Sequence, residues 1–158
     1  MSETLSQTRR EDLSTKGGPP TASEPAIYVV LEGERPLSGG LRAPLANVEE
    51  LHLRRGLTRS FRLEDGKVAV LEIPDPRMSS KHARLIRDEP SPTGERGWLI
   101  EDLGSTNGTF VEGKRASQAA IEEPTVITLG ATCLLFDPAE PVPESAPKTV
   151  VDAASLKS

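Results

Sequence analysis

Three short segments carry the residue types that could bind an anion. They are Arg54-Arg55-Gly56, Ser79-Ser80-Lys81-His82 and Gly104-Ser105-Thr106-Asn107-Gly108-Thr109. The guanidinium of Arg55 presents a planar fork of N–H donors that matches the oxygens of a phosphate. Ser79, Ser80 and Thr106 add hydroxyl donors, and the amide of Asn107 can both donate to and accept from a peptide backbone. This inventory predicts a site that binds a phosphate together with the polypeptide that carries it.

The third segment also contains a strong turn signal. Asn107-Gly108 is a dipeptide that tolerates positive φ and favours a tight turn. Such a turn would fix the directions of the Thr106 and Asn107 side chains. Donors that are ordered before binding lower the entropic cost of binding, so the turn favours a recognition loop.

The charge distribution limits the classes of partner. The net charge is −5, which argues against a general nucleic-acid binder. Between Leu51 and Arg87, however, nine Lys or Arg residues stand against four Asp or Glu residues. On charge alone, a solvated strand face explains this basic zone better than an anion site does.

The elements that must position these segments read as strands. Many short β-branched or alternating runs are separated by Gly, Pro, Asp and Asn, which predicts an all-β sandwich of two antiparallel sheets. In a sandwich the loops gather at two ends, so separate loops can converge. Arg35–Asn47 shows no clear pattern. The predicted strands are Ala26–Leu31, Val48–Leu53, Ser60–Leu63, Lys67–Ile73, His82–Arg87, Trp98–Leu103, Thr109–Val111, Thr125–Leu129 and Thr132–Phe136.

The two ends of the chain differ in composition from the middle. Residues 1–24 and 138–158 hold too few large apolar residues to offset the entropy of ordering, which predicts disordered tails around a folded unit at 25–137. The single Cys133 cannot form an internal disulfide and is predicted to be a small core residue. Two histidines and one cysteine without clustering argue against a metal site. No apolar stretch predicts a membrane span or a signal peptide, so a cytoplasmic protein is the default expectation.

The order and spacing of the three segments closely resemble the forkhead-associated (FHA) domain family. That family's signature is a Gly-Arg pair ending a strand, then Ser-x-x-His, then a Ser-x-Asn-Gly-Thr loop, then Leu-Gly near the last strands. The resemblance covers roughly Ile27 to Asp137. The matching residues are Arg55-Gly56, Ser79-Ser80-Lys81-His82-Ala83, Asp102 to Phe110, and Leu129-Gly130 followed by Leu135-Phe136.

The resemblance implies a sandwich of about eleven strands whose loops at one end bind phosphothreonine. It implies that Arg55 and Ser79 bind the phosphate, that Ser80 and Thr106 assist, and that Asn107 holds the peptide main chain. It gives a structural role in the loops to three further residues, Gly56, His82 and Gly108. It also implies a binding module without catalytic activity or a cofactor.

Two residues depart from the family pattern. Arg54 stands where the family has glycine, so either Arg54 or Arg55 could bind the phosphate; the alternation of Leu51 and Leu53 favours Arg55 at the strand exit. Ser80 stands where Arg or Lys is commoner, which would weaken the pocket. Lys81 is expected to add only diffuse attraction.

The expected partner is a phosphothreonine-containing protein or peptide, such as a serine/threonine kinase or its substrate, and neither nucleic acid nor a membrane. The alternative is a constitutive scaffold whose phosphate pocket is degenerate. A hydrolase using Ser79 and His82 is disfavoured because no oriented acid or oxyanion hole accompanies them.

Thr149, with Asp152 three residues later, is a possible internal ligand. The motif that starts at Asp75-Pro76 resembles the amino-terminal FHA regions of bacterial, especially myxobacterial, enhancer-binding transcription activators.

Overall fold

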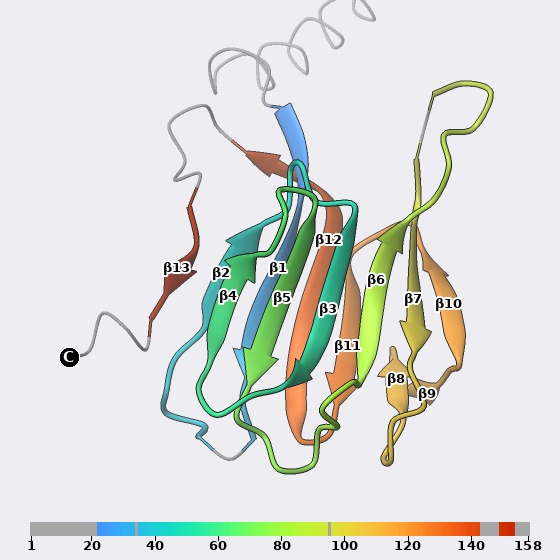
Figure 1. The fold of residues 1–158 in the computed structure, drawn as a ribbon. Coiled ribbons are helices and arrows are strands. Elements are labelled where there is room, and N and C mark those ends of the chain that lie inside the picture. The colour runs from blue at the N-terminus through green and yellow to red at the C-terminus, as the bar shows by residue number, and fades with distance from the viewer. Residues whose placement is uncertain (1–21, 34, 95, 143–148, 154–158) are drawn as a thin grey trace, which may run out of the picture.

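A computed structural model describes residues 22–33, 35–94, 96–142 and 149–153, and within these residues all regular structure is strand (Figure 1). No helix among them is long and apolar enough to cross a membrane. The strands are β1 (Ala22–Leu31), β2 (Leu41–Pro44), β3 (Glu50–Arg55), β4 (Ser60–Leu63), β5 (Val68–Ile73), β6 (Ala83–Arg87), β7 (Trp98–Asp102), β8 (Thr109–Val111), β9 (Lys114–Arg115), β10 (Gln118–Ile121), β11 (Thr125–Leu129), β12 (Thr132–Val142) and β13 (Val151–Asp152).

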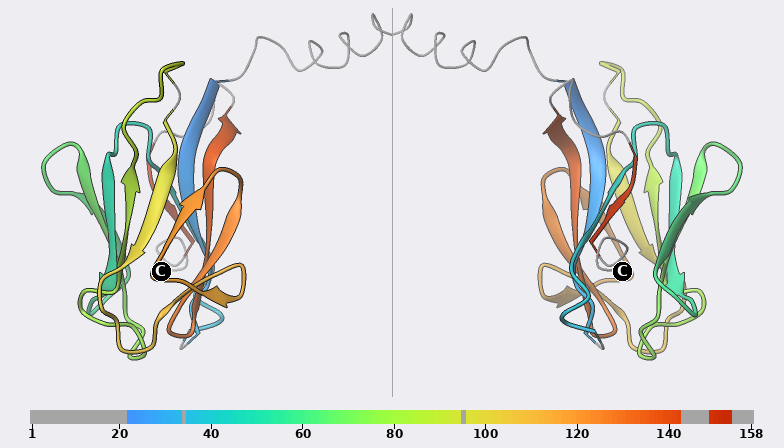
Figure 2. Two further views of the ribbon diagram at one scale, coloured as in Figure 1. Left: turned by 90° about the vertical axis from the view of Figure 1, so that its right-hand side faces the viewer. Right: turned by 90° about the vertical axis from the view of Figure 1, so that its left-hand side faces the viewer.

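The strands form two facing sheets, which confirms the predicted sandwich (Figure 2). The seven-stranded sheet has the order β13-β2-β1-β12-β11-β8-β9, and the six-stranded sheet has the order β10-β7-β6-β3-β5-β4. The prediction of purely antiparallel sheets is wrong at one pair, because β3 and β5 run parallel. The cause is that β4 lies outside β5 rather than between β3 and β5. The described residues contain thirteen strands rather than about eleven, and two of them, β9 and β13, are only two residues long.

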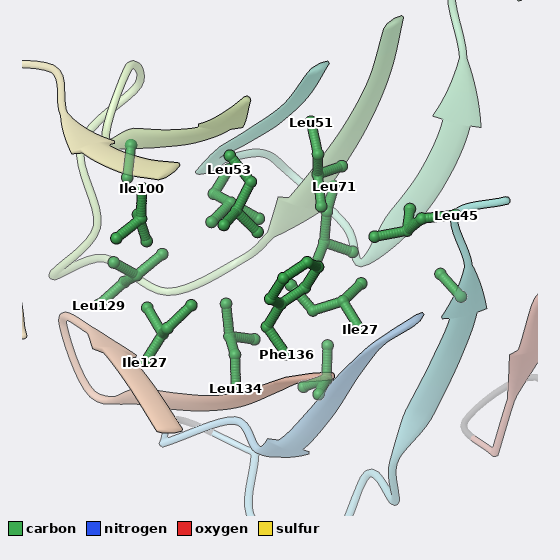
Figure 3. Packing of buried hydrophobic residues seen from close by; sticks show 14 of the residues in the cluster. Ile27, Leu45, Leu51, Leu53, Leu71, Ile100, Ile127, Leu129, Leu134 and Phe136 are labelled. Atoms are coloured by element: carbon green, nitrogen blue, oxygen red, sulfur yellow. The ribbon is translucent and has the colours of Figure 1, made fainter. Parts of the chain in front are cut away.

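The core lies between the sheets and follows the alternation of the strands. Leu53 and Leu71 of the six-stranded sheet face Leu134 and Phe136 of the other sheet (Figure 3), and each of these side chains is at most 1% exposed. The Trp98 ring meets the Phe136 ring edge-on, with centroids 5.1 Å apart, and Trp98 is 1% exposed, so it is a core residue. Burying each such side chain contributes about 1.5–3 kcal/mol.

The strand directions explain why the three predicted segments converge. β5 runs parallel to β3, β6 runs antiparallel to β3, and β7 runs antiparallel to β6. The carboxyl ends of β3, β5 and β7 therefore lie at the same end of the sandwich, which is the lower end in Figure 1. The loops that leave these ends, residues 56–59, 74–82 and 103–108, start side by side.

The ends of the folded unit differ from the predicted limits of 25 and 137. β1 begins at Ala22 and pairs with β12 as far as Val142. Pro138 and Pro141 are tolerated because the pairing of β12 with β11 ends at Phe136, and beyond it only one side of β12 is paired. The chain returns at β13, which pairs with β2. The other residues of the predicted tails, 1–21, 143–148 and 154–158, lie outside the described residues.

Two local predictions are also corrected. Cys133 is only half-buried, because its neighbours Thr132 and Leu134 are the residues of β12 that face the core there. The segment without a clear pattern contains β2, in which Leu41 and Ala43 are buried. A strand with only two inward residues gives too short an alternation to be read from sequence.

Candidate functional site

The first two loops are joined by hydrogen bonds from Arg55. Its backbone N–H donates to the carbonyl oxygen of Ser79 at 2.9 Å. Its guanidinium Nη1 donates to the carbonyl oxygen of Met78 at 3.0 Å. The side chain of Arg55 is exposed, so this bond fixes one edge of the guanidinium while other N–H donors remain for a ligand.

The second and third loops are joined in the same way. The N–H of Thr106 donates to Oγ of Ser79 at 3.0 Å, and Nδ2 of Asn107 donates to the carbonyl oxygen of Arg77 at 2.9 Å. The Ser79 hydroxyl accepts in this contact, so its own hydrogen can donate to a bound anion. We call the surface formed by Arg55, Ser79, Ser80, Thr106 and Asn107 the rim; all of them are exposed except Ser79, which is half-buried.

The second loop is shaped by a buried carboxylate. Asp75 is 0% exposed and accepts hydrogen bonds from the N–H of Arg77, the N–H of Ala131 and Oγ1 of Thr132, each at 2.8 Å. The first bond makes the local turn, and the other two tie the loop to the start of β12. The side chain of Met78, 1% exposed, belongs to the hydrophobic core. Ser79 and Ser80 therefore extend from an anchored turn.

His82 connects the second and third loops from inside the protein. Its ring is 0% exposed. The N–H of Ser79 donates to Nδ1 at 3.0 Å, so Nδ1 is the acceptor and Nε2–H donates to the carbonyl oxygen of Gly108 at 2.8 Å. Both ring nitrogens are used within the protein, so His82 holds the loops and is not placed to act on a ligand.

Asp102 orders the third loop. Its carboxylate accepts from the N–H groups of Gly104 and Ser105 and from the hydroxyls of Ser105 and Thr109. Burial alone would raise the pKa of Asp102, but these hydrogen bonds outweigh it and hold the pKa below its ordinary value. Oγ of Ser105 accepts in turn from the N–H of Gly108 at 2.9 Å. The positive φ of Gly108, 89°, completes the turn.

The two arginines at the end of β3 have different surroundings. Nε of Arg54 donates to Oε2 of Glu72 at 2.9 Å, and this bond, with help from Arg62, lowers the pKa of Glu72. Arg54 and Lys81 line a hollow of about 290 Å³ on the outer face of the six-stranded sheet. Arg55, by contrast, donates hydrogen bonds to the carbonyl oxygens of Met78 and Ser79 in the second loop. Gly56 is required here because a Cβ would lie 2.7 Å from Cβ of Glu72.

The possible internal ligand lies away from the rim. Thr149 is exposed and lines a hollow with Phe61, Leu63 and Gly66. Gly66 lies in the turn between β4 and β5, at the end of β5 opposite to the rim. The carboxylate of Asp152 pairs with Arg59 and is not presented to the rim.

Sequence reasoning missed the residues that support the rim. Asp75 and Met78 were not predicted to have a role in the site, and Ser105 was predicted only as a member of the third segment. For Asp75 a signal exists, because an Asp two residues before a turn N–H commonly accepts from it. No local signal identifies Met78, because its contact with Arg55 depends on how β3 and β5 pair.

The sequence and the fold were compared with those of known proteins. Residues 57–130 match the model of the FHA domain family. Over 81 residues the chain is 36% identical to the ABC transporter ATP-binding/permease protein Rv1747 of Mycobacterium tuberculosis, covering 51% of this chain and 8% of that protein. Over 51 residues it is 41% identical to the FHA domain-containing protein FhaB of Mycolicibacterium smegmatis, covering 32% and 29%. The chain thus spans a small part of these relatives.

A solved structure matches a larger part of this chain than either relative does. The crystal structure of the FHA domain of the CT664 protein from Chlamydia trachomatis is 25% identical in sequence and superposes with a TM-score of 0.50. The match covers 72% of this chain and 96% of that domain. It therefore includes most of the sandwich described above.

Proposed function

We propose that this chain contains an FHA domain, because residues 57–130 match the model of that family and the fold resembles a solved FHA domain, and that its rim binds a phosphorylated threonine on a partner protein or peptide, without catalysing a reaction. The observation that carries the proposal is the joining of three loops at one end of the sandwich by the hydrogen bonds of Arg55, Thr106 and Asn107. These bonds fix the donors before a ligand arrives, which lowers the entropic cost of binding.

Each rim residue has a distinct role in the proposal. Arg55 uses its free N–H donors for the phosphate, and Ser79 donates its hydroxyl hydrogen to the same group. Ser80 and Thr106 add hydroxyl or backbone donors at the edge. Asn107 holds the main chain of the ligand with its amide oxygen, since its Nδ2 is already bound to Arg77.

The phosphate supplies most of the discrimination in this proposal. A phosphothreonine carries a charge of about −1.5 to −2 and three acceptor oxygens that plain threonine lacks. Titration of a phosphothreonine peptide and of its unphosphorylated twin measures the difference, and we expect binding of the phosphorylated form only. A phosphoserine twin should bind more weakly, because the loop backbone around Thr106 and Asn107 would leave a niche for the threonine methyl group. Equal affinities for the phosphorylated and plain threonine peptides would contradict the proposal.

A pair of neighbouring substitutions tests which arginine binds the phosphate. Arg55→Ala should weaken phosphopeptide binding by about 2–5 kcal/mol, because it leaves the phosphate short of its fork of donors. Arg54→Ala is the matched control: its side chain pairs with Glu72, so binding should change little. Calorimetric titration of both variants checks this, and a larger loss for Arg54→Ala would reverse the assignment.

The scaffold alternative has become weaker. The support for a degenerate pocket was that Arg54 and Ser80 depart from the family pattern. The side chain of Arg54 is held by Glu72 away from the rim, so the arginine at this position leaves the rim intact. Capture of a partner equally well before and after phosphatase treatment would favour the scaffold. A serine/threonine kinase as the source of the phosphate and a cytoplasmic setting are parts of our proposal. A role in transcription regulation rests on the resemblance of the sequence alone.

A further inference from the structure

The described basic side chains fall into two groups. Seven arginines lie within 4.0 Å of a carboxylate: Arg35, Arg42, Arg54, Arg59, Arg62, Arg84 and Arg96. The basic residues without such a pair in the described part of the chain are Arg55, Lys67, Arg77, Lys81, Arg87, Lys114 and Arg115. Two of this second group lie away from the rim, because Lys67 follows the turn before β5 and Arg87 stacks over Trp98 at 5.1 Å. Of the others, Arg55 ends β3, Arg77 and Lys81 lie in the loop between β5 and β6, and Lys114 and Arg115 form β9. Within the described residues, none of these five side chains has a carboxylate within 4.0 Å.

Arg115 has a defined position among these residues. It lies on β9, which pairs with β8 so that Arg115 is opposite Phe110, and its side chain is exposed. A Cβ added to Gly108 would lie 2.7 Å from Nε and 3.0 Å from Cζ of Arg115. The guanidinium therefore lies against the backbone of Gly108, directly beside Asn107.

We propose that Arg115 is a second anion-binding point of the rim and that it binds an acidic side chain of the ligand, a carboxylate or a second phosphate, close in sequence to the phosphothreonine. This inference rests on the proposed function. A ligand main chain held by Asn107 passes next to Gly108, so a flanking side chain comes within reach of the guanidinium. A guanidinium without an internal carboxylate partner can pair with a ligand anion without first breaking an ion pair.

The experiment uses phosphothreonine peptides that differ at one position only. Glutamate and glutamine are placed in turn at each position flanking the phosphothreonine, and each peptide is titrated by fluorescence anisotropy into the full chain. We expect one position at which glutamate binds about three- to tenfold more tightly than glutamine, as for an exposed ion pair with good geometry. The advantage should shrink at high salt. A peptide with phosphoserine at that position distinguishes a carboxylate from a second phosphate. If its affinity exceeds that of the glutamate peptide, the ligand is doubly phosphorylated.

Two variants decide whether Arg115 is responsible. Arg115→Gln should make the glutamate and glutamine peptides bind equally while the glutamine peptide keeps its affinity. Lys67→Gln is the matched control, because it changes the net charge by the same amount and lies away from the rim; it should keep the preference. The inference is overturned if no position favours glutamate, or if Arg115→Gln weakens both peptides alike, as a purely structural role would. If the glutamine phosphopeptide binds but its unphosphorylated twin does not, the proposed function stands in either case.

Discussion

At the scale of single residues, the buried side chains that support the rim are separate from the side chains that form its surface. His82 and Asp75 are fully buried and bond only within the protein. Arg55 and Asn107 are exposed, and the side chain of each donates one hydrogen bond to a carbonyl oxygen of the second loop. Substitutions of the exposed pair should therefore change binding with little effect on stability, whereas substitutions of the buried pair should change both.

Asp102 provides a prediction that depends on pH. Its pKa is lowered in the folded chain, so the stability that it contributes is present above its unfolded-state pKa and is lost as the pH falls through the folded value. Asp102→Asn should destabilise the protein by about 1–3 kcal/mol at neutral pH, because it disturbs four hydrogen bonds. The variant should also lose less stability than the parent as the pH falls below about 4.

Urea denaturation at several pH values measures both effects of Asp102→Asn. Asp65→Asn is a suitable control, because Asp65 is exposed in the turn before β5 and accepts from the N–H of Val68 there. It should lower stability much less at neutral pH, since an exposed backbone donor can bond to water instead. Parallel pH profiles for the parent and Asp102→Asn would contradict the assignment.

At the scale of elements, local pattern predicted the strands that have a clear alternation or a β-branched run. Ser60–Leu63, Thr109–Val111 and Thr125–Leu129 begin and end as predicted. β2, β9, β10 and β13 were missed, because each of these short strands lacks a β-branched run and is defined by its partner rather than by its own pattern. The parallel pairing of β3 and β5 could not be predicted either, since pairing depends on contacts between distant segments.

The same distinction applies to the site. The Ser79 and Asn107 loops could be predicted because turn chemistry and donor types are local properties. The contact of Arg55 with Met78 and that of Arg115 with Gly108 arise from strand pairing. Sequence alternation alone favoured Arg55 over Arg54, but the tertiary structure was needed to show that Arg55 bonds Met78 while Arg54 bonds Glu72, and that Arg115 lies beside Gly108.

β13 gives a prediction for an element. The Arg59 side chain is 2% exposed and pairs with Asp152 of β13, while Glu32 lies 3.7 Å from its Nη1. Asp152→Asn leaves this buried guanidinium with only the more distant carboxylate, which should lower the free energy of unfolding by about 2–3 kcal/mol. Glu64→Gln, in an exposed pair with Arg62, is the control and should cost less than about 1 kcal/mol. Urea unfolding midpoints at constant m-value compare the two variants, and equal midpoints would mean that the Arg59–Asp152 pair contributes no more than the exposed Arg62–Glu64 pair.

At the scale of the whole molecule, β1 and β12 join the two ends of the folded unit. Their pairing runs from Leu31 opposite Cys133 near the rim to Ala22 opposite Val142 at the far end. Beyond Phe136, Glu140 binds both the Tyr28 hydroxyl and the Arg42 guanidinium. Burial first, and then the bond to Glu140, raises the pKa of Tyr28. This far end stabilises the sandwich without contributing to the rim.

The limits of the folded unit can be tested by shortening the chain. A chain ending at Val142 loses β13 and the Asp152 ion pair, and a chain ending at Asp137 also loses Glu140 and the last pairs of β12 with β1. Stability should fall in that order, with the chain ending at Asp137 roughly 3–5 kcal/mol less stable than the full chain, at about 1 kcal/mol for each lost hydrogen bond. The single tryptophan, Trp98, packs against Phe136, which all three chains keep. Its fluorescence therefore reports unfolding in urea on the same basis for each chain. If the chain ending at Asp137 unfolds at the same urea concentration as the full chain, the extension of β12 and the return of β13 are not part of the cooperative unit.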